Sequence, residues 1–203
     1  MSRYDVIIIG AGPGGIFAAY ELAKKAPELK VAVFEAGNSL EKRKCPIDGK
    51  KIKSCINCKT CAIMSGFGGA GAFSDGKYNI TNDFGGTLYE YIGKDTAIDL
   101  MKYVDEINLA YGGEGTKMYS TAGTDIKKLC IQNELKLLDA SVRHLGTDIN
   151  YIVLENLYKE LKEKVEFRFN YRVDELEAVD GGYRVISGDS TDECEEWIIS
   201  VGR

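Results

Sequence analysis

The chain has 203 residues, of which 44% are hydrophobic and 28% are charged, a profile typical of an ordinary globular protein. The formal net charge of −5 argues against a broad nucleic-acid-binding surface. No targeting segment precedes the strand-like run at residues 5–9, and the longest uncharged stretch, residues 6–20, is too short to span a bilayer. We therefore expect a cytoplasmic protein with neither nucleic-acid nor membrane partners.

The first 35 residues predict a strand, a turn, a helix and a second strand. Residues 6–9 form a β-branched run, which is typical of a parallel strand buried on both faces. From Gly14 the hydrophobic residues recur at helical spacing until about Pro27, and residues 31–34 form the next buried strand. Together these elements predict one βαβ half-unit.

The sequence changes character between residues 37 and 86. Basic residues and cysteines alternate first, and a glycine-dense stretch with few core-forming residues follows, so this region is a functional loop, a linker or both. Three helices are then predicted by hydrophobic periodicity, at 95–111, 125–138 and about 150–164.

The last forty residues predict strands. A strand at 165–169 precedes a hairpin whose turn lies at 180–182, and the acidic run 189–196 is expected to be a solvated hairpin end. Residues 197–203 read as a buried strand. A finished domain seldom stops at the tip of a core strand, so we expect the chain to be part of a longer one.

The pattern G-x-G-x-x-G occupies residues 10–15, between the first predicted strand and the first predicted helix. Gly10 permits a tight turn, Gly12 lets the backbone approach a pyrophosphate, and Gly15 lets the helix pack closely on the strand. The amides and the helix dipole at Gly14 would face the phosphates. Glu35 ends the second strand, where its carboxylate can accept hydrogen bonds from an adenosine ribose. The sequence therefore predicts a dinucleotide-binding turn.

A second glycine-rich loop covers residues 65–77. So many small residues suit a close approach of the backbone to a large flat or charged ligand. The alternative is a flexible linker, against which count the two phenylalanines and the lack of a Ser/Gly repeat.

Four of the six cysteines fall within one short basic segment, at Cys45, Cys55, Cys58 and Cys61. This spacing lets loop-borne sulfurs converge on one ion or cluster, and the neighbouring lysines would offset the charge of the thiolates. Zinc, an iron–sulfur cluster, a redox disulfide and unligated thiols all remain open. Cys130 and Cys194 lie in helix and strand contexts, where we expect packing roles.

The extended pattern Gly10-x-Gly12-x-x-Gly15-x-x-x-Ala19, closed by residues 33–37, resembles the opening of two-dinucleotide-fold flavoproteins. Residues 43–46, the cysteines, the block 68–77 and residues 143–148 further resemble a family of bacterial FAD-dependent dehydrogenases. The resemblance implies an α/β fold with a Rossmann-type, glutathione-reductase-like FAD-binding domain, an inserted mainly helical substrate or cap segment, and FAD as cofactor.

The resemblance also implies a discontinuous domain arrangement. Residues 1–86 and 165–203 would form the FAD-binding domain, and residues 87–164 would be the helical part of a substrate or cap domain. The chain would act as an FAD-dependent oxidoreductase on an unidentified small molecule, with a separate electron donor or acceptor. Family members are longer, so the alternative is a truncated, non-catalytic FAD- or metal-binding module. An RNA-modifying flavoprotein is disfavoured by the acidic charge.

By the same resemblance, the cofactor contacts come from both glycine loops, from the segment after the second strand and from the C-terminal turn: Gly10, Gly12, Pro13, Gly14, Gly15, Glu35, Ala36, Arg43, Gly68, Gly69, Ala70, Gly71, Ser74, Val173 and Gly202. Val173 would lie against the adenine. No catalytic residue is assigned. His144, the single histidine, is expected to be a solvated or capping residue rather than a general acid. Lys77 is either close to the flavin or a surface residue.

Overall fold

A computed structural model describes residues 2–202 and divides into two compact units. Unit 1 contains the chain up to residue 73 and from residue 154 onward, and unit 2 contains residues 74–153. The sequence placed these boundaries at 86 and 165. The glycine-rich stretch is therefore divided between the units, and helix α5 (Thr147–Leu161) runs across the second boundary.

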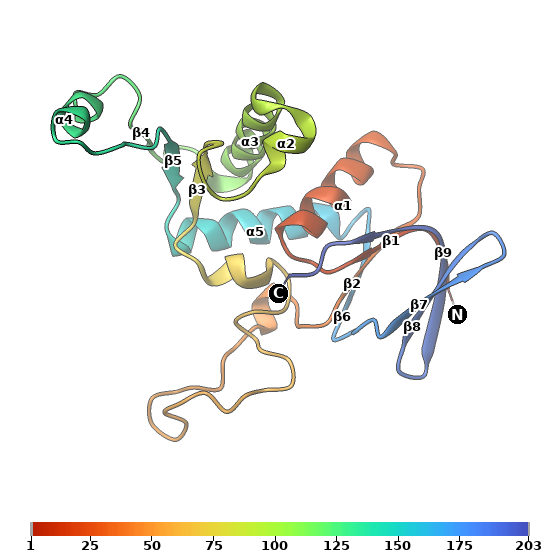
Figure 1. The fold of residues 1–203 in the computed structure, drawn as a ribbon. Helices are drawn as coiled ribbons and strands as arrows, with labels where there is room; N and C mark the ends of the chain where they lie inside the picture. The colour runs from red at the N-terminus through yellow and green to blue at the C-terminus, as the bar shows by residue number, and fades with distance from the viewer. Residues whose placement is uncertain (1, 203) are drawn as a thin grey trace. The chain divides into compact units, whose positions relative to one another are not determined.

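Unit 1 is built on a six-stranded sheet of order β6-β2-β1-β9-β8-β7 (Figure 1). Strands β1 (Arg3–Ile9), β2 (Val31–Glu35), β6 (Glu166–Phe169) and β9 (Ser190–Ile199) are parallel, and β7 (Glu175–Val179) and β8 (Gly182–Ser187) extend the sheet as an antiparallel hairpin. Parallel neighbours need a crossover, which helix α1 (Pro13–Lys25) provides between β1 and β2.

Residues 6–9 of β1 and 31–34 of β2 are all apolar. Ile7 and Ile8 of β1 and Ala32 and Val33 of β2 have no exposed surface, as the uninterrupted hydrophobic runs predict. Ile8 is paired with Val33 on one side and with Ile198 on the other. Burial of each of the isoleucine and valine side chains contributes about 1.5–3 kcal/mol. The carboxyl ends of β1 and β2 are thereby fixed side by side.

An aromatic cluster attaches the second glycine loop to unit 1. Phe67 is completely buried and lies 4.9 Å, ring centre to ring centre, from Tyr158 of α5. The ring centres of Phe167 and Phe169, both in β6, lie 5.7 and 6.5 Å from that of Phe67. Aromatic pairs of this kind add about 0.5–1.5 kcal/mol each beyond area burial. A short 3₁₀ helix, η1 (Leu40–Lys42), precedes the segment that leads to this loop, and a second, η2 (Gly69–Phe73), lies within the loop.

Unit 2 combines helices with a small sheet that the sequence did not predict. Its helices are α2 (Leu88–Ile92), α3 (Lys94–Asn108), α4 (Ile126–Gln132) and the beginning of α5, and α3 continues into a π-helical turn, η3 (Leu109–Gly113). Strands β3 (Lys77–Ile80), β5 (Ser141–His144) and β4 (Met118–Ser120) form an antiparallel sheet in that order. A buried ion pair joins β5 to α3, since Arg143 Nε and Nη2 donate to the Asp105 carboxylate at 2.6 and 2.8 Å.

Four local expectations are corrected. Helix α4 ends at Gln132 rather than near 138, and α5 begins at Thr147 rather than near 150. The acidic run 189–196 is a solvated hairpin end only at residue 189, because residues 190–196 lie in β9, where Asp192 is 3% exposed. Cys194 is a buried packing residue as expected, and Cys130 is half-buried. The strand predicted to reach the last residue ends at Ile199, and Arg203 lies outside the described residues.

Across residues 2–202, none of the helices combines the length and the apolarity that crossing a membrane requires.

Candidate functional site

A cavity of about 740 Å³ lies in unit 1, where β1 and β2 end and α1 begins. Its volume falls within the range of small-molecule and cofactor sites, roughly 300–1,000 Å³. Ligands in open α/β sheets bind outside the carboxyl ends of the parallel strands, which is where this cavity lies.

The first glycine loop needs glycine at two positions for the fold itself. Gly10 has a φ of +101°, and a Cβ atom there would lie 2.5 Å from the backbone oxygen of Ser200 at the end of β9. A Cβ atom on Gly15 would overlap the backbone oxygen of Gly10. The Gly10 amide donates to Phe34 O at 2.8 Å, which closes the turn against β2. These two residues allow close packing of strand, turn and helix.

Gly12 has a different role, because the space beside it is open. A Cβ atom on Gly12 would meet no atom within 4 Å, and its φ of −73° is accessible to any residue. Gly12 is the N-cap of α1 and lines the cavity, and no side chain caps the helix there. The first turn of α1 also carries no acidic residue. Uncapped backbone N–H groups at a helix N-terminus favour an anionic group.

The second glycine loop lies against the first. A Cβ atom on Gly69 would be 3.1 Å from Gly12 Cα, and one on Gly71 would be 3.7 Å from Pro13 Cγ. The Gly68 amide donates to Ala11 O at 2.8 Å. Because Gly12, Gly69 and Gly71 carry no side chain, the backbones of the two glycine loops form one continuous wall of the cavity.

Glu35 ties three loops together at the end of β2. Its carboxylate accepts hydrogen bonds from the backbone N–H groups of Ala11 at 2.7 Å and of Gly37 and Gly66 at 2.8 Å each, and the residue is 7% exposed. Oε1 receives two of these bonds and Oε2 receives one. A carboxylate has about four acceptor positions. Among residues 2–202 no donor uses the remaining acceptor position, on Oε2, and Glu35 lines the cavity.

Arg43, which was predicted to contact the cofactor, is not among the residues that line the cavity. The side chain is 6% exposed and its guanidinium group is 4.7 Å from the ring centre of Phe73. It donates hydrogen bonds of 2.7–2.9 Å to four backbone carbonyls, those of Ala62, Ile63, Phe67 and Gly69. Burial lowers the pKa of Arg43, and the charges of Glu35 and Cys61 oppose that shift. In this structure Arg43 is a brace for the second glycine loop.

Most of the other predicted cofactor residues do line the cavity: Gly10, Gly12, Pro13, Gly14, Glu35, Ala36, Gly69, Ala70, Gly71, Val173 and Gly202. Gly15, Gly68 and Ser74 do not, and Ser74 belongs to unit 2, where its hydroxyl accepts from the Gly76 amide at 3.1 Å. The wall further contains residues that sequence reasoning did not single out: Ile9, Phe34, Met64, Tyr171, Arg172 and Ser200. Phe34 could have been found from its place directly before Glu35, whereas Tyr171 carries no sequence signal.

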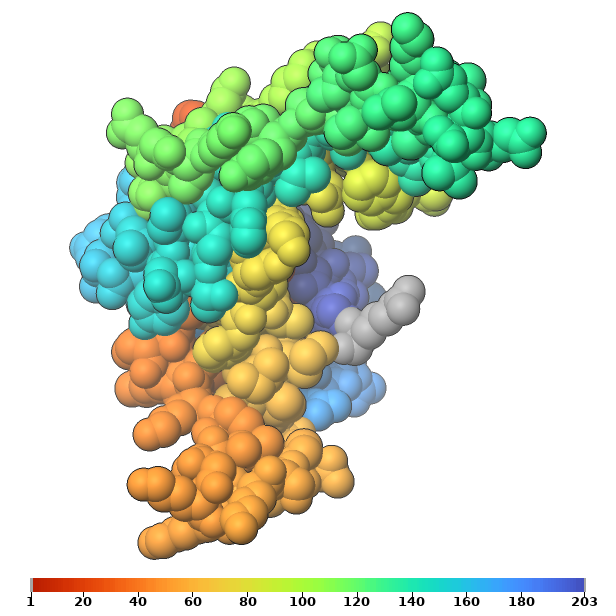
Figure 2. All heavy atoms as spheres, turned by 90° about the vertical axis from the view of Figure 1, so that its left-hand side faces the viewer, coloured from red at the N-terminus to blue at the C-terminus, as the bar shows by residue number. Residues whose placement is uncertain are grey.

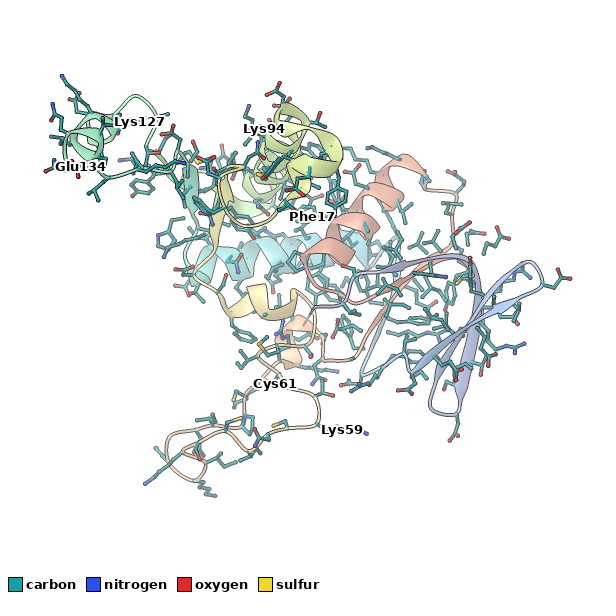
Figure 3. All side chains as sticks on the ribbon, viewed as in Figure 1. Phe17, Lys59, Cys61, Lys94, Lys127 and Glu134 are labelled. Carbon is teal, nitrogen blue, oxygen red and sulfur yellow. The ribbon has the colours of Figure 1, made fainter. Side chains whose placement is uncertain are left out.

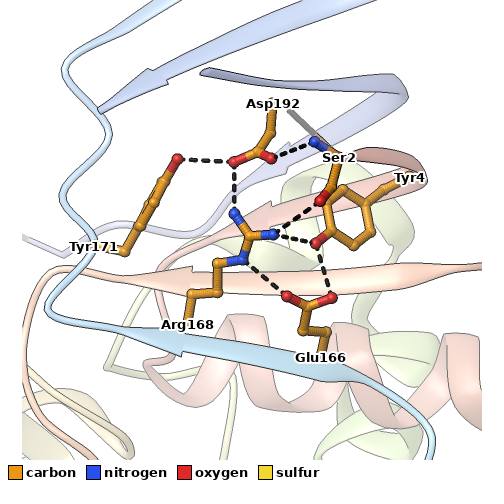
Figure 4. A network of polar contacts seen from close by, with 6 residues as sticks. All are labelled: Ser2, Tyr4, Glu166, Arg168, Tyr171 and Asp192. Atoms are coloured by element: carbon orange, nitrogen blue, oxygen red, sulfur yellow. Dashed lines mark hydrogen bonds and ion pairs between the residues drawn. The ribbon is translucent and has the colours of Figure 1, made fainter. Parts of the chain in front are cut away.

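Tyr171 is held in the wall by a polar network behind it (Figure 4). Its hydroxyl donates to Asp192 Oδ2 at 2.8 Å, and Arg168 Nη1 donates to the same oxygen at 2.6 Å. Arg168 also bonds to Glu166 at 2.8 Å and to the Tyr4 hydroxyl at 2.6 Å. Burial, reinforced by the bond to Asp192, raises the pKa of Tyr171 to about 12. The network joins β1, β6 and β9 and fixes this side of the cavity.

The remaining candidates are not brought to the cavity wall. Cys45 and Cys61 are half-buried and Cys55 and Cys58 are exposed, all four as free thiols. Within the described part of the chain, no three His, Cys, Asp or Glu side chains gather as ligands of one metal ion. In unit 2, His144 is exposed on β5, and the Lys77 ammonium pairs with Asp75 at 2.7 Å.

The first 41 residues match the profile of the Thi4 family. Thiamine thiazole synthase of Yarrowia lipolytica is 64% identical over 33 residues, 16% of this chain and 10% of that protein. The corresponding protein of Fusarium oxysporum is 57% identical over 35 residues, 17% of this chain and 11% of that protein. The similarity thus spans about a tenth of these curated relatives and is confined to the βαβ opening.

Two solved structures share the fold of the chain. Glycine oxidase from Geobacillus kaustophilus superposes with a TM-score of 0.55 and 17% identity, over 100% of this chain and 56% of that one. The anhydrotetracycline hydroxylase OxyS from Streptomyces rimosus gives a TM-score of 0.52 and 16% identity, over 98% and 32%. The chain thus spans about half or less of each. Together with the parallel sheet order, these likenesses confirm the α/β Rossmann-type fold that the sequence predicted.

Proposed function

We propose that this chain is the FAD-binding part of an FAD-dependent oxidoreductase and that its cavity holds the adenosine diphosphate half of the cofactor. The observation that carries the proposal is the cavity wall made by the two glycine loops and Glu35. It combines open backbone at Gly12 with an acceptor position on a buried carboxylate that no donor of the described residues uses. A dinucleotide presents a pyrophosphate and ribose hydroxyls, which are the groups such a wall can bind.

Each part of the wall has a chemical role in this proposal. The N-terminus of α1 and the open backbone at Gly12 receive the pyrophosphate, because both favour negative charge at close range. A ribose hydroxyl donates to Oε2 of Glu35. Val173 lies against the adenine, and the rings of Phe34 and Tyr171, 4.6 Å apart, complete that apolar side. Arg43 acts indirectly, by holding the second glycine loop in position.

Bound FAD supplies the capacity to accept a hydride or an electron pair from a small-molecule substrate. A separate donor or acceptor of electrons completes the cycle, and no nucleic-acid or membrane partner is part of the proposal. We further infer that unit 2 belongs to the substrate or cap side of the whole protein. Membership of the bacterial FAD-dependent dehydrogenases, implied by the sequence resemblance, is part of this proposal, and so is the cytoplasmic location expected from the sequence.

Two other functions compete with this one. A non-catalytic FAD- or metal-binding module has the same cavity and differs in lacking turnover. Thiazole synthesis would follow from the relatives' names, but the match to them ends at residue 41, before the second glycine loop begins. It therefore supports dinucleotide binding and carries no support for the synthase reaction.

The test is a calorimetric titration of the purified chain with FAD, ADP and riboflavin. We expect FAD to bind, ADP to compete with it, and riboflavin to compete poorly, because the proposed contacts of the cavity are with the adenosine diphosphate half of FAD. If neither FAD nor ADP binds, the proposal is wrong. Oxidation of a reduced nicotinamide or another donor by the FAD-loaded chain would separate an oxidoreductase from the non-catalytic module.

A further inference from the structure

The cysteine loop, residues 44–65, is unusual because it contains neither a helix nor a strand. Its outer part, residues 47–60, which we call the arm, is exposed throughout except for half-buried Ile52. The arm extends away from the sheet of unit 1 (Figures 1 and 2). Structureless loops of this length are uncommon in compact domains and generally have a function. Because the arm buries no apolar core, its order has to come from another source.

Hydrogen bonds within the arm are local. Oδ1 of Asp48 accepts from the amides of Lys50, Lys51 and Ile52 at 2.8–2.9 Å, which closes one tight turn. A second turn surrounds Cys55, whose sulfur accepts from the Asn57 amide at 3.4 Å while Asn57 adopts a φ of +52°. Backbone N–H groups directed at sulfur are a common feature of metal–thiolate sites. The backbone before Cys58 is therefore already turned around a sulfur atom.

The base of the cysteine loop is braced, in contrast to the arm. Arg43, two residues before Cys45, donates to the carbonyls of Ala62 and Ile63, directly after Cys61. The two half-buried cysteines therefore lie at the two ends of a closed loop. Figure 3 labels Cys61 at the base and Lys59 on the arm.

We propose that the cysteine loop is a zinc-binding site in which the thiolates of Cys45, Cys55, Cys58 and Cys61 hold one ion. Two ligands come from the braced base and two from the arm, which folds back to complete a tetrahedral set. The four thiols do not converge in this structure, so the proposal requires that zinc binding and rearrangement of the arm be coupled. One ion shared by four sulfurs is the simplest centre that this loop can form, and it requires no sulfide and no oxidant.

Charge balance is satisfied by the chain itself. Zn²⁺ replaces four thiol protons, which pass to solvent, and the Zn(S–Cys)₄ group that results carries a charge of −2. The loop and its edges are rich in cations, with Lys42, Arg43, Lys44, Lys50, Lys51, Lys53 and Lys59. Glu41 and Asp48 are the acidic residues in the same stretch. A zinc site would thus explain both the four cysteines, as ligands, and the basic residues, as the charges that offset the zinc–thiolate group.

The test uses the full chain, reduced and stripped of metal, titrated with Zn²⁺ against a chromogenic chelator. We expect one zinc per chain, release of protons on binding, and the absorption of tetrahedral thiolate coordination when Co²⁺ replaces Zn²⁺. The double variant Cys55→Ser/Cys58→Ser should lose zinc. Cys130→Ser is the matched control, because Cys130 lies on α4 of unit 2 outside the loop, and it should bind zinc as the parent does.

Trypsin gives a second readout that is independent of any activity. Zinc should slow cleavage at Lys50, Lys51 and Lys53 in the parent and leave cleavage of the double variant unchanged. Absence of zinc binding overturns the proposal, and so does a disulfide or an iron–sulfur centre in the freshly isolated chain. FAD binding rests on residues outside the arm, so titration with ADP distinguishes failure of this proposal from failure of the proposed function.

Discussion

At the scale of single residues, alanine substitutions at Gly12 and Gly15 should have opposite effects, although both residues belong to one motif: the first should weaken FAD binding and the second should destabilise the fold. Gly12→Ala should leave the ligand-free fold intact, because its backbone angles suit alanine and the space beside it is open. The methyl group would instead occupy the place of the pyrophosphate. We expect FAD binding to weaken roughly 10- to 100-fold, since overpacking costs about 1–3 kcal/mol. Calorimetric titration measures the affinity, and thermal unfolding without ligand measures the fold.

Gly15→Ala is the matched comparison. Its methyl group would overlap the backbone oxygen of Gly10, which no side-chain rotation can relieve. We expect it to lower the free energy of unfolding by roughly 1–3 kcal/mol or more even without FAD. A destabilised Gly12→Ala, or a Gly15→Ala as stable as the parent, would contradict the assigned roles.

At the scale of elements, the network behind Tyr171 makes unfolding depend on alkaline pH. The pKa of Tyr171 rises from its ordinary value of 10.0 to about 12, so the folded state favours the neutral phenol. This contribution to stability is complete below pH 10 and disappears as the pH rises through 12. Tyr171→Phe lacks it and also loses the bond to Asp192, which is worth about 1 kcal/mol. The stability gap between the two proteins should therefore narrow above pH 10.

Denaturant unfolding at several pH values measures this gap, and an ultraviolet titration of the phenols follows the ionisation directly. A gap that stays constant from neutral pH to pH 12 would contradict the assignment. Tyr4, whose pKa is also raised by burial, is present in both proteins and therefore cancels in the comparison.

The same elements show what the sequence can predict. Strands β1 and β2 and helix α1 are specified by local periodicity and a glycine turn, so their positions and the first glycine loop followed from the sequence. Strands β3, β4 and β5 have three or four residues and pair over long sequence distances, which leaves no local signal. Asp192 appeared to be a solvated acid, and only its tertiary bonds with Arg168 and Tyr171 explain its burial. The brace formed by Arg43 likewise depends on contacts across a long loop.

At the scale of the whole molecule, the division into two units predicts where FAD should act. Every residue lining the cavity belongs to unit 1. A ligand that binds only the folded state stabilises it by about 2.7 kcal/mol at a hundredfold excess over its Kd, which is about a hundredfold in the opening equilibrium. Amides of β1 and β2 that exchange through unfolding of unit 1 should therefore exchange about a hundredfold more slowly with FAD.

Helix α3 of unit 2 provides the internal reference, because all its residues lie outside unit 1. Hydrogen exchange followed by mass spectrometry with and without FAD should show protection in β1 and β2 and an unchanged rate in α3. Equal protection in both places would mean that the two units unfold together as one cooperative unit. Protection in α3 alone would place the cofactor outside the cavity and would contradict the proposed site.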